Sequence, residues 1–383
     1  MMKKIGSAMP LLLGIFAVCA ASNAAEAPVP EPFRGYDETS KRVINYDVLS
    51  DLLSAMVLEV EPSNRTFASP PPTITGTRLK AKLTETSNEG NRFFFEAFRD
   101  NEQGQKFLRE IQVSLEQLPS QTPLDTFSRD EQLAYWLNLY NVTVLNQIVA
   151  EYPKRSLRNL VRGKHSLFSK KLLTVAGIPL SLNDIQFTIL AQNYDHNPLI
   201  IYGLYQGVVG GPSIRRSAFY GGDVWYALEQ NAYEFINSNR GTRSYGPGTF
   251  RVSGLYDYNR EFFPTFETDL EEHLLQYLKG DEREHLQSAT DLQANIYDWT
   301  VTDMGGTEHR VGGSLANNPS ALIDSYKSNH KSIFGGFRTA TLEVIWKKDK
   351  PREELDPDTD FGAVPVEGAG IEGIQLDPAT SPD

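Results

Sequence analysis

Two asparagines three residues apart are the first side chains that could do chemistry. Asn138 and Asn141 belong to the run Ala-Tyr-Trp-Leu-Asn-Leu-Tyr-Asn at 134–141. Residues three apart in a helix lie on one side of it, and buried amides need hydrogen-bond partners. We therefore expect the two side chains either to form hydrogen bonds with the backbone of neighbouring loops, which we favour, or to contact a ligand.

Two titratable side chains are further candidates. His165, in the basic stretch Arg-Gly-Lys-His-Ser at 162–166, is the best placed of the six histidines to act as a base. No two histidines have the close spacing of a helical zinc pair, so we expect no metal and no other cofactor. Asp184 precedes Ile185 where a helix is expected to start, which favours a helix cap over a catalytic acid.

A glycine-rich loop follows the apolar run 199–204. Its sequence, Gly-Val-Val-Gly-Gly-Pro at 207–212, has neither the Lys-Ser/Thr ending of a phosphate loop nor the spacing of a dinucleotide-binding loop. Arg215 and Arg216 follow directly. They are candidates for binding an anion.

The strongest signal for an element that positions these residues is a helix at 132–151. Ser128 and Glu131 form a capping box before it, and Pro153 ends it. Its apolar residues form a broad face. They are Leu133, Trp136, Leu137, Tyr140, Val144, Leu145 and Ile148.

Other segments predict a helix-rich α+β fold, with one main domain and a small β-sheet. Apolar residues at helical spacing predict a helix at 41–59. The β-branched residues around Gly177 predict a hairpin at 173–180. A short apolar run predicts a buried strand at 199–204, and two further helices are expected at 222–237 and 268–278.

The N-terminus predicts export. Lys3 and Lys4 precede an apolar run from Met9 to Ala20 and small residues up to Ala24, the pattern of a cleaved signal peptide. The run is too short to cross a membrane, and no other apolar run is long enough. The one cysteine, Cys19, would be lost with the signal. We therefore expect a periplasmic protein without thiols, cleaved near Ala24.

The charge balance excludes some partners. The chain has 37 basic and 49 acidic side chains, and loss of the two signal lysines takes the net charge from −12 to about −14. Such a surface repels phosphate backbones and anionic lipids. We expect an unknown protein or small-molecule ligand as partner, no nucleic acid and no membrane span.

Several motifs occur in an order that resembles the domain of unknown function 547 family, over roughly residues 125–300. They are the aromatic-Asn run at 134–141, Tyr152-Pro153, Val175-Ala176-Gly177, Leu182-Asn183-Asp184-Ile185, the apolar run and glycine loop at 198–214, Val252-Ser253-Gly254-Leu255-Tyr256 with Phe262-Phe263, and Tyr297-Asp298-Trp299. The resemblance implies a shared fold and a cluster of one glutamate, two histidines and two cysteines, which could serve thiol, metal or redox chemistry.

This chain departs from the pattern at all five positions that the resemblance implies. Gln186 and Phe187 stand at the Glu-His pair, Ile201 at the second histidine, and Gln206 and Gly211 at the two cysteines. The chain is therefore interpreted as a divergent member without the thiol chemistry of the family.

Two hypotheses follow for the function. The favoured one is an uncharacterised exported protein that binds a partner or a small ligand. The alternative is a hydrolase or transferase with an atypical site around Asn138, Asn141 and Gln206. The candidate pocket consists of Asn138, Asn141, Asp184, Gln206 and His165.

The expected organisation has five parts. They are a signal peptide at 1–24, a helical lead-in with an irregular proline-rich stretch at 25–124, the family-like domain at 125–300, a C-terminal extension packed on it at 301–350, and a disordered acidic tail at 351–383.

Overall fold

The computed structural model describes residues 27–68, 84–154, 156–162, 166–304, 309–311, 314–316 and 340–346. All of them belong to one unit that extends to Lys347. The expected signal at 1–24, His165 and the expected acidic tail at 351–383 lie outside the described residues. No helix within the described ranges combines the length and hydropathy needed to span a membrane.

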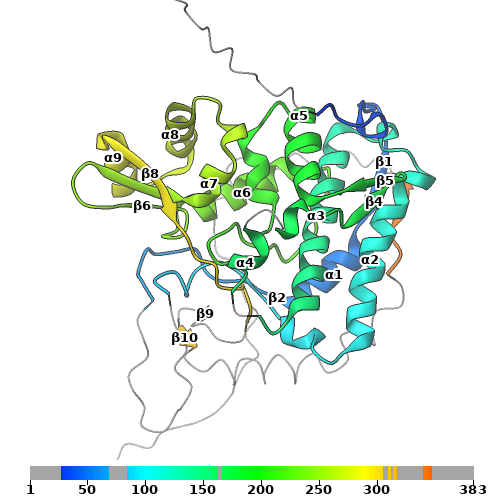
Figure 1. Cartoon of the computed structure of the whole chain (residues 1–383), viewed down its shortest axis with the longest axis horizontal. Coiled ribbons are helices and arrows are strands. Elements are labelled where there is room, and N and C mark those ends of the chain that lie inside the picture. The colour runs from blue at the N-terminus through cyan, green and yellow to red at the C-terminus, as the bar shows by residue number, and fades with distance from the viewer. Residues whose placement is uncertain are drawn as a thin grey trace, which may run out of the picture. The chain divides into compact units, whose positions relative to one another are not determined.

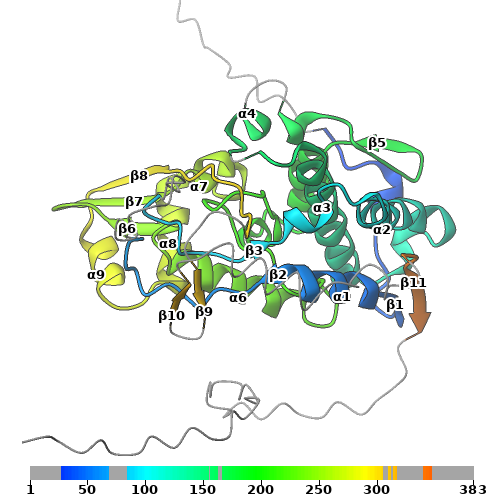
Figure 2. The same cartoon turned by 90° about the horizontal axis from the view of Figure 1, so that it is seen from below.

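A long helix, α3 (Arg129–Glu151), forms the centre of the fold. It confirms the helix predicted from the capping box, since the Ser128 hydroxyl accepts a hydrogen bond from the Glu131 amide at 3.3 Å. Buried residues occupy nearly every side of α3, as expected for a helix covered by other elements. Figures 1 and 2 show α2 (Glu102–Gln121) on one side of it and α6 (Val224–Ile236) on the other.

The helix predicted at 41–59 is only partly correct. Its middle is α1 (Asp47–Met56), but strand β1 (Arg42–Asn45) precedes it and strand β2 (Val57–Leu58) follows it. β1 pairs with β11 (Glu343–Trp346), about 300 residues later in the chain. The β-branched residues Val43 and Ile44 suit a strand, and the partner strand is too distant in sequence for local spacing to reveal.

The buried strand predicted at 199–204 is wrong. The segment Pro198–Gly203 forms a 3-10 helix, with the side chain of Asn197 accepting a hydrogen bond from the Leu199 amide at 3.0 Å. An Asn cap followed by proline at the first helical position is a helix start. These two residues outweigh the apolar composition of the run.

The remaining predicted elements are confirmed with small shifts of their ends. The hairpin consists of β4 (Leu173–Val175) and β5 (Ile178–Leu180), joined by Ala176 and Gly177, which both have positive φ. Helix α6 corresponds to the prediction at 222–237, and α8 (Phe266–Tyr277) to that at 268–278.

The long helix α2 was not predicted by its bounds, although its signals are present in the sequence. The Asn101 side chain caps α2 by accepting a hydrogen bond from the Gly104 amide at 3.0 Å. The buried Phe107, Leu108, Ile111 and Leu115 of α2 have helical spacing. This helix packs against α3 and makes the lead-in a structural part of the fold.

A three-stranded sheet lies beside the last helices (Figure 1). Its central strand β7 (Thr249–Ser253) pairs antiparallel with β6 (Thr242–Ser244) and parallel with β8 (Asp291–Ile296). The other described α-helices and strands are α4 (Arg158–Val161), α5 (Ala191–Asn193), α7 (Gly254–Tyr258), α9 (Asp281–Ser288), β3 (Arg92–Phe93), β9 (His309–Val311) and β10 (Ser314–Ala316). Helices with small sheets confirm the α+β class.

Candidate functional site

The amides of Asn138 and Asn141 each hold one loop by its backbone. Asn138 donates to the Phe219 carbonyl at 2.8 Å and accepts from the Phe219 amide at 2.9 Å. Asn141 donates to the Gly203 carbonyl and accepts from the Tyr205 amide, both at 2.9 Å. The cavity beside them measures about 10 Å³, room for little more than one water molecule. The side-chain amides of Asn138 and Asn141 are thus bonded to loop backbone, with little space beside them for a ligand.

An extended segment, residues 298–304, holds the glycine loop in place. The amides of Val209 and Gly210 donate to the carbonyls of Thr300 at 2.8 Å and Asp298 at 2.9 Å. On its other side the segment receives a hydrogen bond of 3.0 Å from the Leu157 amide to the Trp299 carbonyl. The glycine loop and the start of α4 are thus joined through one strand-like segment.

Asp298 is a structural hydrogen-bond acceptor in this segment. Its buried carboxylate accepts hydrogen bonds from the Thr84 hydroxyl at 2.5 Å, the Thr86 hydroxyl at 2.7 Å and the Thr300 amide at 2.9 Å. These donors satisfy the buried charge. They also attach residues 84–86 of the lead-in to the main domain.

A larger cavity, of about 370 Å³, opens beside the glycine loop, and Gln206 lies in its wall. Ligand sites commonly have volumes of about 300–1,000 Å³. Both apolar and polar residues line it, with Leu255 among the apolar and Asn183 among the polar ones. Of the residues predicted for a pocket, Gln206 thus borders this cavity, whereas Asn138 and Asn141 border the small one.

An arginine and two aromatic rings form one edge of the cavity. The rings of Tyr297 and Trp299 are stacked, with centroids 5.5 Å apart. The Arg162 guanidinium lies 4.8 Å from the Tyr297 centroid and 5.1 Å from that of Trp299, within cation–π range. Gly254 makes room for the Tyr297 ring, because a Cβ at that position would lie 1.9 Å from Tyr297 Cε1.

Tyr258 borders the cavity on another side. Its hydroxyl donates to the Asn183 side chain at 2.8 Å, while 42% of the residue remains exposed. Burial of the hydroxyl raises the pKa of Tyr258 to about 12. The phenol is therefore neutral at neutral pH and serves as a hydrogen-bonding group.

Asp184, expected as a helix cap, is the first residue of the π-helix Asp184–Leu190 and bonds Ser181, three residues before it. The Ser181 hydroxyl accepts from the Asp184 amide at 3.1 Å, and the Asp184 carboxylate accepts from the Ser181 amide at 2.5 Å. Burial raises the pKa of Asp184, but hydrogen bonds from Lys171 and Ser181 outweigh it and hold the pKa below its usual value. This carboxylate is occupied as a structural group.

Two of the positions that differ from the family pattern are fully packed. Ile201 is 1% exposed. Gln186 is also buried; its amide donates to the Asn259 side chain and accepts from the Tyr140 hydroxyl at 3.5 Å. Phe187 is half-buried, with its ring 5.5 Å from that of Tyr258.

The other two positions, Gln206 and Gly211, lie next to each other across the glycine loop. A Cβ built on Gly211 would be 3.4 Å from the Cβ of Gln206, close to the range of about 3.5–4.5 Å found in disulfides. We therefore predict that the double variant Gln206→Cys with Gly211→Cys forms a disulfide under oxidising conditions.

The measurement is thiol alkylation of the denatured protein, read by mass spectrometry. The oxidised double variant should resist alkylation at both positions until a reductant is added. The parent chain, whose one cysteine is Cys19, shows the alkylation that occurs without the two new thiols. The single variant Gln206→Cys should be alkylated without prior reduction. Free alkylation of both new thiols after oxidation would show that the two positions are not adjacent.

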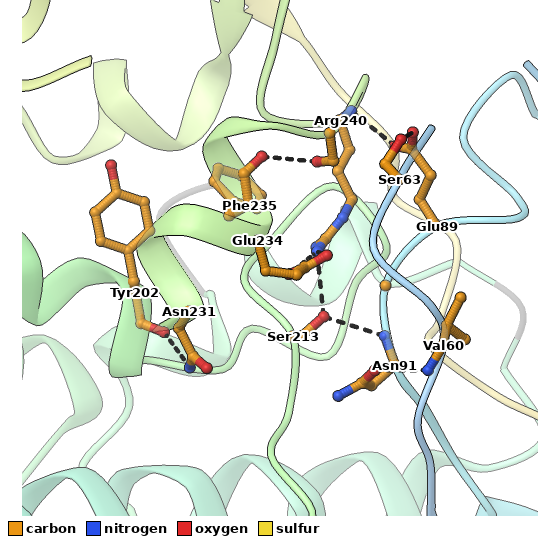
Figure 3. Close-up of polar contacts among 12 residues, drawn as sticks. Val60, Ser63, Glu89, Asn91, Tyr202, Ser213, Asn231, Glu234, Phe235 and Arg240 are labelled. Atoms are coloured by element: carbon orange, nitrogen blue, oxygen red, sulfur yellow. Dashed lines mark hydrogen bonds and ion pairs between the residues drawn. The ribbon is translucent and has the colours of Figure 1, made fainter. Parts of the chain in front are cut away.

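A buried arginine, Arg240, holds the end of the glycine loop by hydrogen bonds, some of which Figure 3 shows. Its guanidinium donates to the carbonyl of Gly211, to the Ser213 hydroxyl at 3.1 Å and to the carboxylate of Glu234. The buried Glu89 carboxylate accepts from the Arg240 backbone amide at 3.0 Å. Residues far apart in sequence thereby hold the loop that carries Gln206.

The arginines predicted to bind an anion are engaged with separate helices. Arg215 donates to the Ala227 carbonyl of α6 at 3.2 Å, and burial lowers its pKa. Arg216 donates to the Ser54 carbonyl of α1 at 3.2 Å. Neither residue lines the cavity at Gln206. Within the described ranges, no group of three or more His, Cys, Asp or Glu side chains could hold a metal ion.

Comparison with known protein families agrees with the motif order in the first part of the domain. Residues 124–236 match the family model described as Protein of unknown function, DUF547. The match covers less than half of the chain, and it supports DUF547 membership of this segment. No curated protein matches the chain, and no solved structure does.

Proposed function

We propose that this chain is exported and binds a small-molecule ligand in the cavity at Gln206, without the thiol chemistry that the family resemblance implies. The observation that carries the proposal is the cavity of about 370 Å³, which has an uncharged amide in its wall where a cysteine would stand. A pocket that combines apolar walls with a few polar groups is the usual form of a ligand site. Export rests on the signal pattern at residues 1–24 and stays a prediction.

The alternative, a hydrolase or transferase around Asn138, Asn141 and Gln206, has less support. Both asparagine amides bond loop backbone, and they border a cavity other than that of Gln206. General acid–base catalysis requires a titratable group within hydrogen-bond reach of the reacting atoms. Asp298, the buried acid near Gln206, already holds three donors.

The test is capture of small molecules by the purified protein. The protein is incubated with a metabolite extract, separated from free compounds and denatured, and the released compounds are identified by mass spectrometry. We expect compounds enriched by the wild type to be lost from Gln206→Trp, because the indole would fill the cavity. Released compounds that are chemically altered would instead favour an enzyme.

The matched control is Gln103→Trp, which places the same indole at an exposed position of α2. It should retain the captured compounds. If Gln206→Trp folds with an unchanged melting temperature and still captures them, the ligand lies elsewhere and the proposed site is wrong.

A further inference from the structure

The charge at the cavity is the feature that narrows the class of ligand. Arg162 is exposed and lines the cavity. Within the described ranges, no side chain forms an ion pair with its guanidinium and no acceptor takes a hydrogen bond from it; its contacts are with the rings of Tyr297 and Trp299. Its N–H groups are therefore available to a ligand.

The acids at the cavity have other partners. Asp257 accepts a hydrogen bond from Arg260 at 2.8 Å, and the Asp298 carboxylate is buried among its donors Thr84, Thr86 and the Thr300 amide. Arg162 is consequently a local positive charge in a protein whose net charge is −12. Such a contrast favours an anion at this one place.

The rings also prepare Arg162 for this role. A guanidinium stacked on aromatic rings keeps its N–H fork in a fixed plane, and the fork matches a carboxylate or a similar oxyanion with two hydrogen bonds. Less side-chain freedom is then lost on binding than for a solvated arginine.

The rest of the cavity suits an apolar body rather than further negative charge. Phe168, Leu255 and Ile296 line it. Binding of an apolar group against these side chains removes apolar surface from water, which is favourable. A polyphosphate or a nucleic acid would need several cations, whereas Arg162 is the one basic side chain among the described residues that line the cavity.

We infer that the cavity takes a small amphipathic monoanion, an organic carboxylate or sulfonate whose charged head binds Arg162 and whose apolar body lies between Phe168 and Leu255. The inference rests on the proposed function, because it names the ligand class of the same cavity.

The experiment uses two dyes that share a ring system and differ in charge. One is 1-anilinonaphthalene-8-sulfonate and the other is the neutral N-phenyl-1-naphthylamine; binding of each to the purified protein is followed by fluorescence. Arg162→Gln should bind the sulfonate at least about tenfold more weakly than wild type, since a hydrogen bond to a charged group is lost. The affinity for the neutral dye should change less than about twofold.

Two controls separate the inference from the proposed function. Arg158→Gln removes an exposed arginine at the start of α4, the helix that ends just before Arg162. Arg158 does not line the cavity, so this variant should leave both affinities unchanged. Gln206→Trp should abolish binding of both dyes. If Gln206→Trp abolishes both but Arg162→Gln binds the sulfonate as well as wild type, the anion inference is wrong and the proposed function stands. If Gln206→Trp leaves both dyes bound, both are wrong.

Discussion

Replacing Arg240 with leucine is expected to lower the free energy of unfolding by about 3 kcal/mol, the lower end of the range for breaking a buried ion pair. The Arg240 side chain is 1% exposed, and that of Glu234 is 26% exposed. Leucine would leave the Glu234 carboxylate and the Gly211 carbonyl without this donor, while the Ser213 hydroxyl would keep the Asn91 amide as a donor at 3.1 Å. Partial access to water lets Glu234 hydrate, which keeps the cost near the lower limit.

Urea denaturation of the variant and the wild type gives the measurement. The control, Lys106→Ala, breaks an exposed ion pair with Glu110 on α2 and should cost less than about 1 kcal/mol. Adding Glu234→Leu to Arg240→Leu should recover part of the loss, because the unpaired charge is removed with its partner. A loss below about 1 kcal/mol for Arg240→Leu would mean that the network contributes little to stability.

The elements that the sequence predicted well are those with local signals. The Ser128 cap and the apolar face define α3, and Gly177 defines the hairpin turn, because each signal acts within a few residues. The segments 41–59 and 199–204 were misjudged for opposite reasons. In the first, a distant strand, β11, decides the conformation of β1. In the second, the local cap at Asn197 starts a 3-10 helix in spite of the apolar composition of the run.

The candidate site was predictable in part. Gln206 was identified from the motif order, and it does border the cavity. Tyr297 and Trp299 were visible as a motif, and in an extended segment residues two apart share one face, so their joint approach to the cavity could have been inferred. Arg162 could not, since its position depends on the non-local hydrogen bond between Leu157 and Trp299.

A second large effect is expected from pH, through the buried His273. Its ring is 6% exposed, lies among the rings of Tyr202, Phe263 and Tyr277, and bonds the Tyr202 hydroxyl through Nε2 at 2.8 Å. Burial lowers the pKa of His273 from 6.5 to about 4, because the charged imidazolium cannot be hydrated there.

The sign of the effect follows from proton binding. Between pH 6.5 and 4 the unfolded chain binds a proton at this histidine and the folded chain does not, so folding loses stability as the pH falls through this window and loses no more below it. Each pKa unit corresponds to about 1.4 kcal/mol, so the full effect is about 3 kcal/mol. We expect His273→Gln, which keeps a polar group for Tyr202 but cannot titrate, to lack this contribution.

Urea denaturation at several pH values between about 7.5 and 4 tests this expectation. The stability of His273→Gln relative to wild type should rise by about 3 kcal/mol as the pH falls, whatever its offset at pH 7.5. The control is His285→Gln, at an exposed position of α9. It measures how far replacing a solvated histidine changes the pH dependence of the free energy of unfolding. Parallel pH curves for His273→Gln and wild type would show that His273 takes up its proton equally in both states, and the tight aromatic packing around it would have to be rejected.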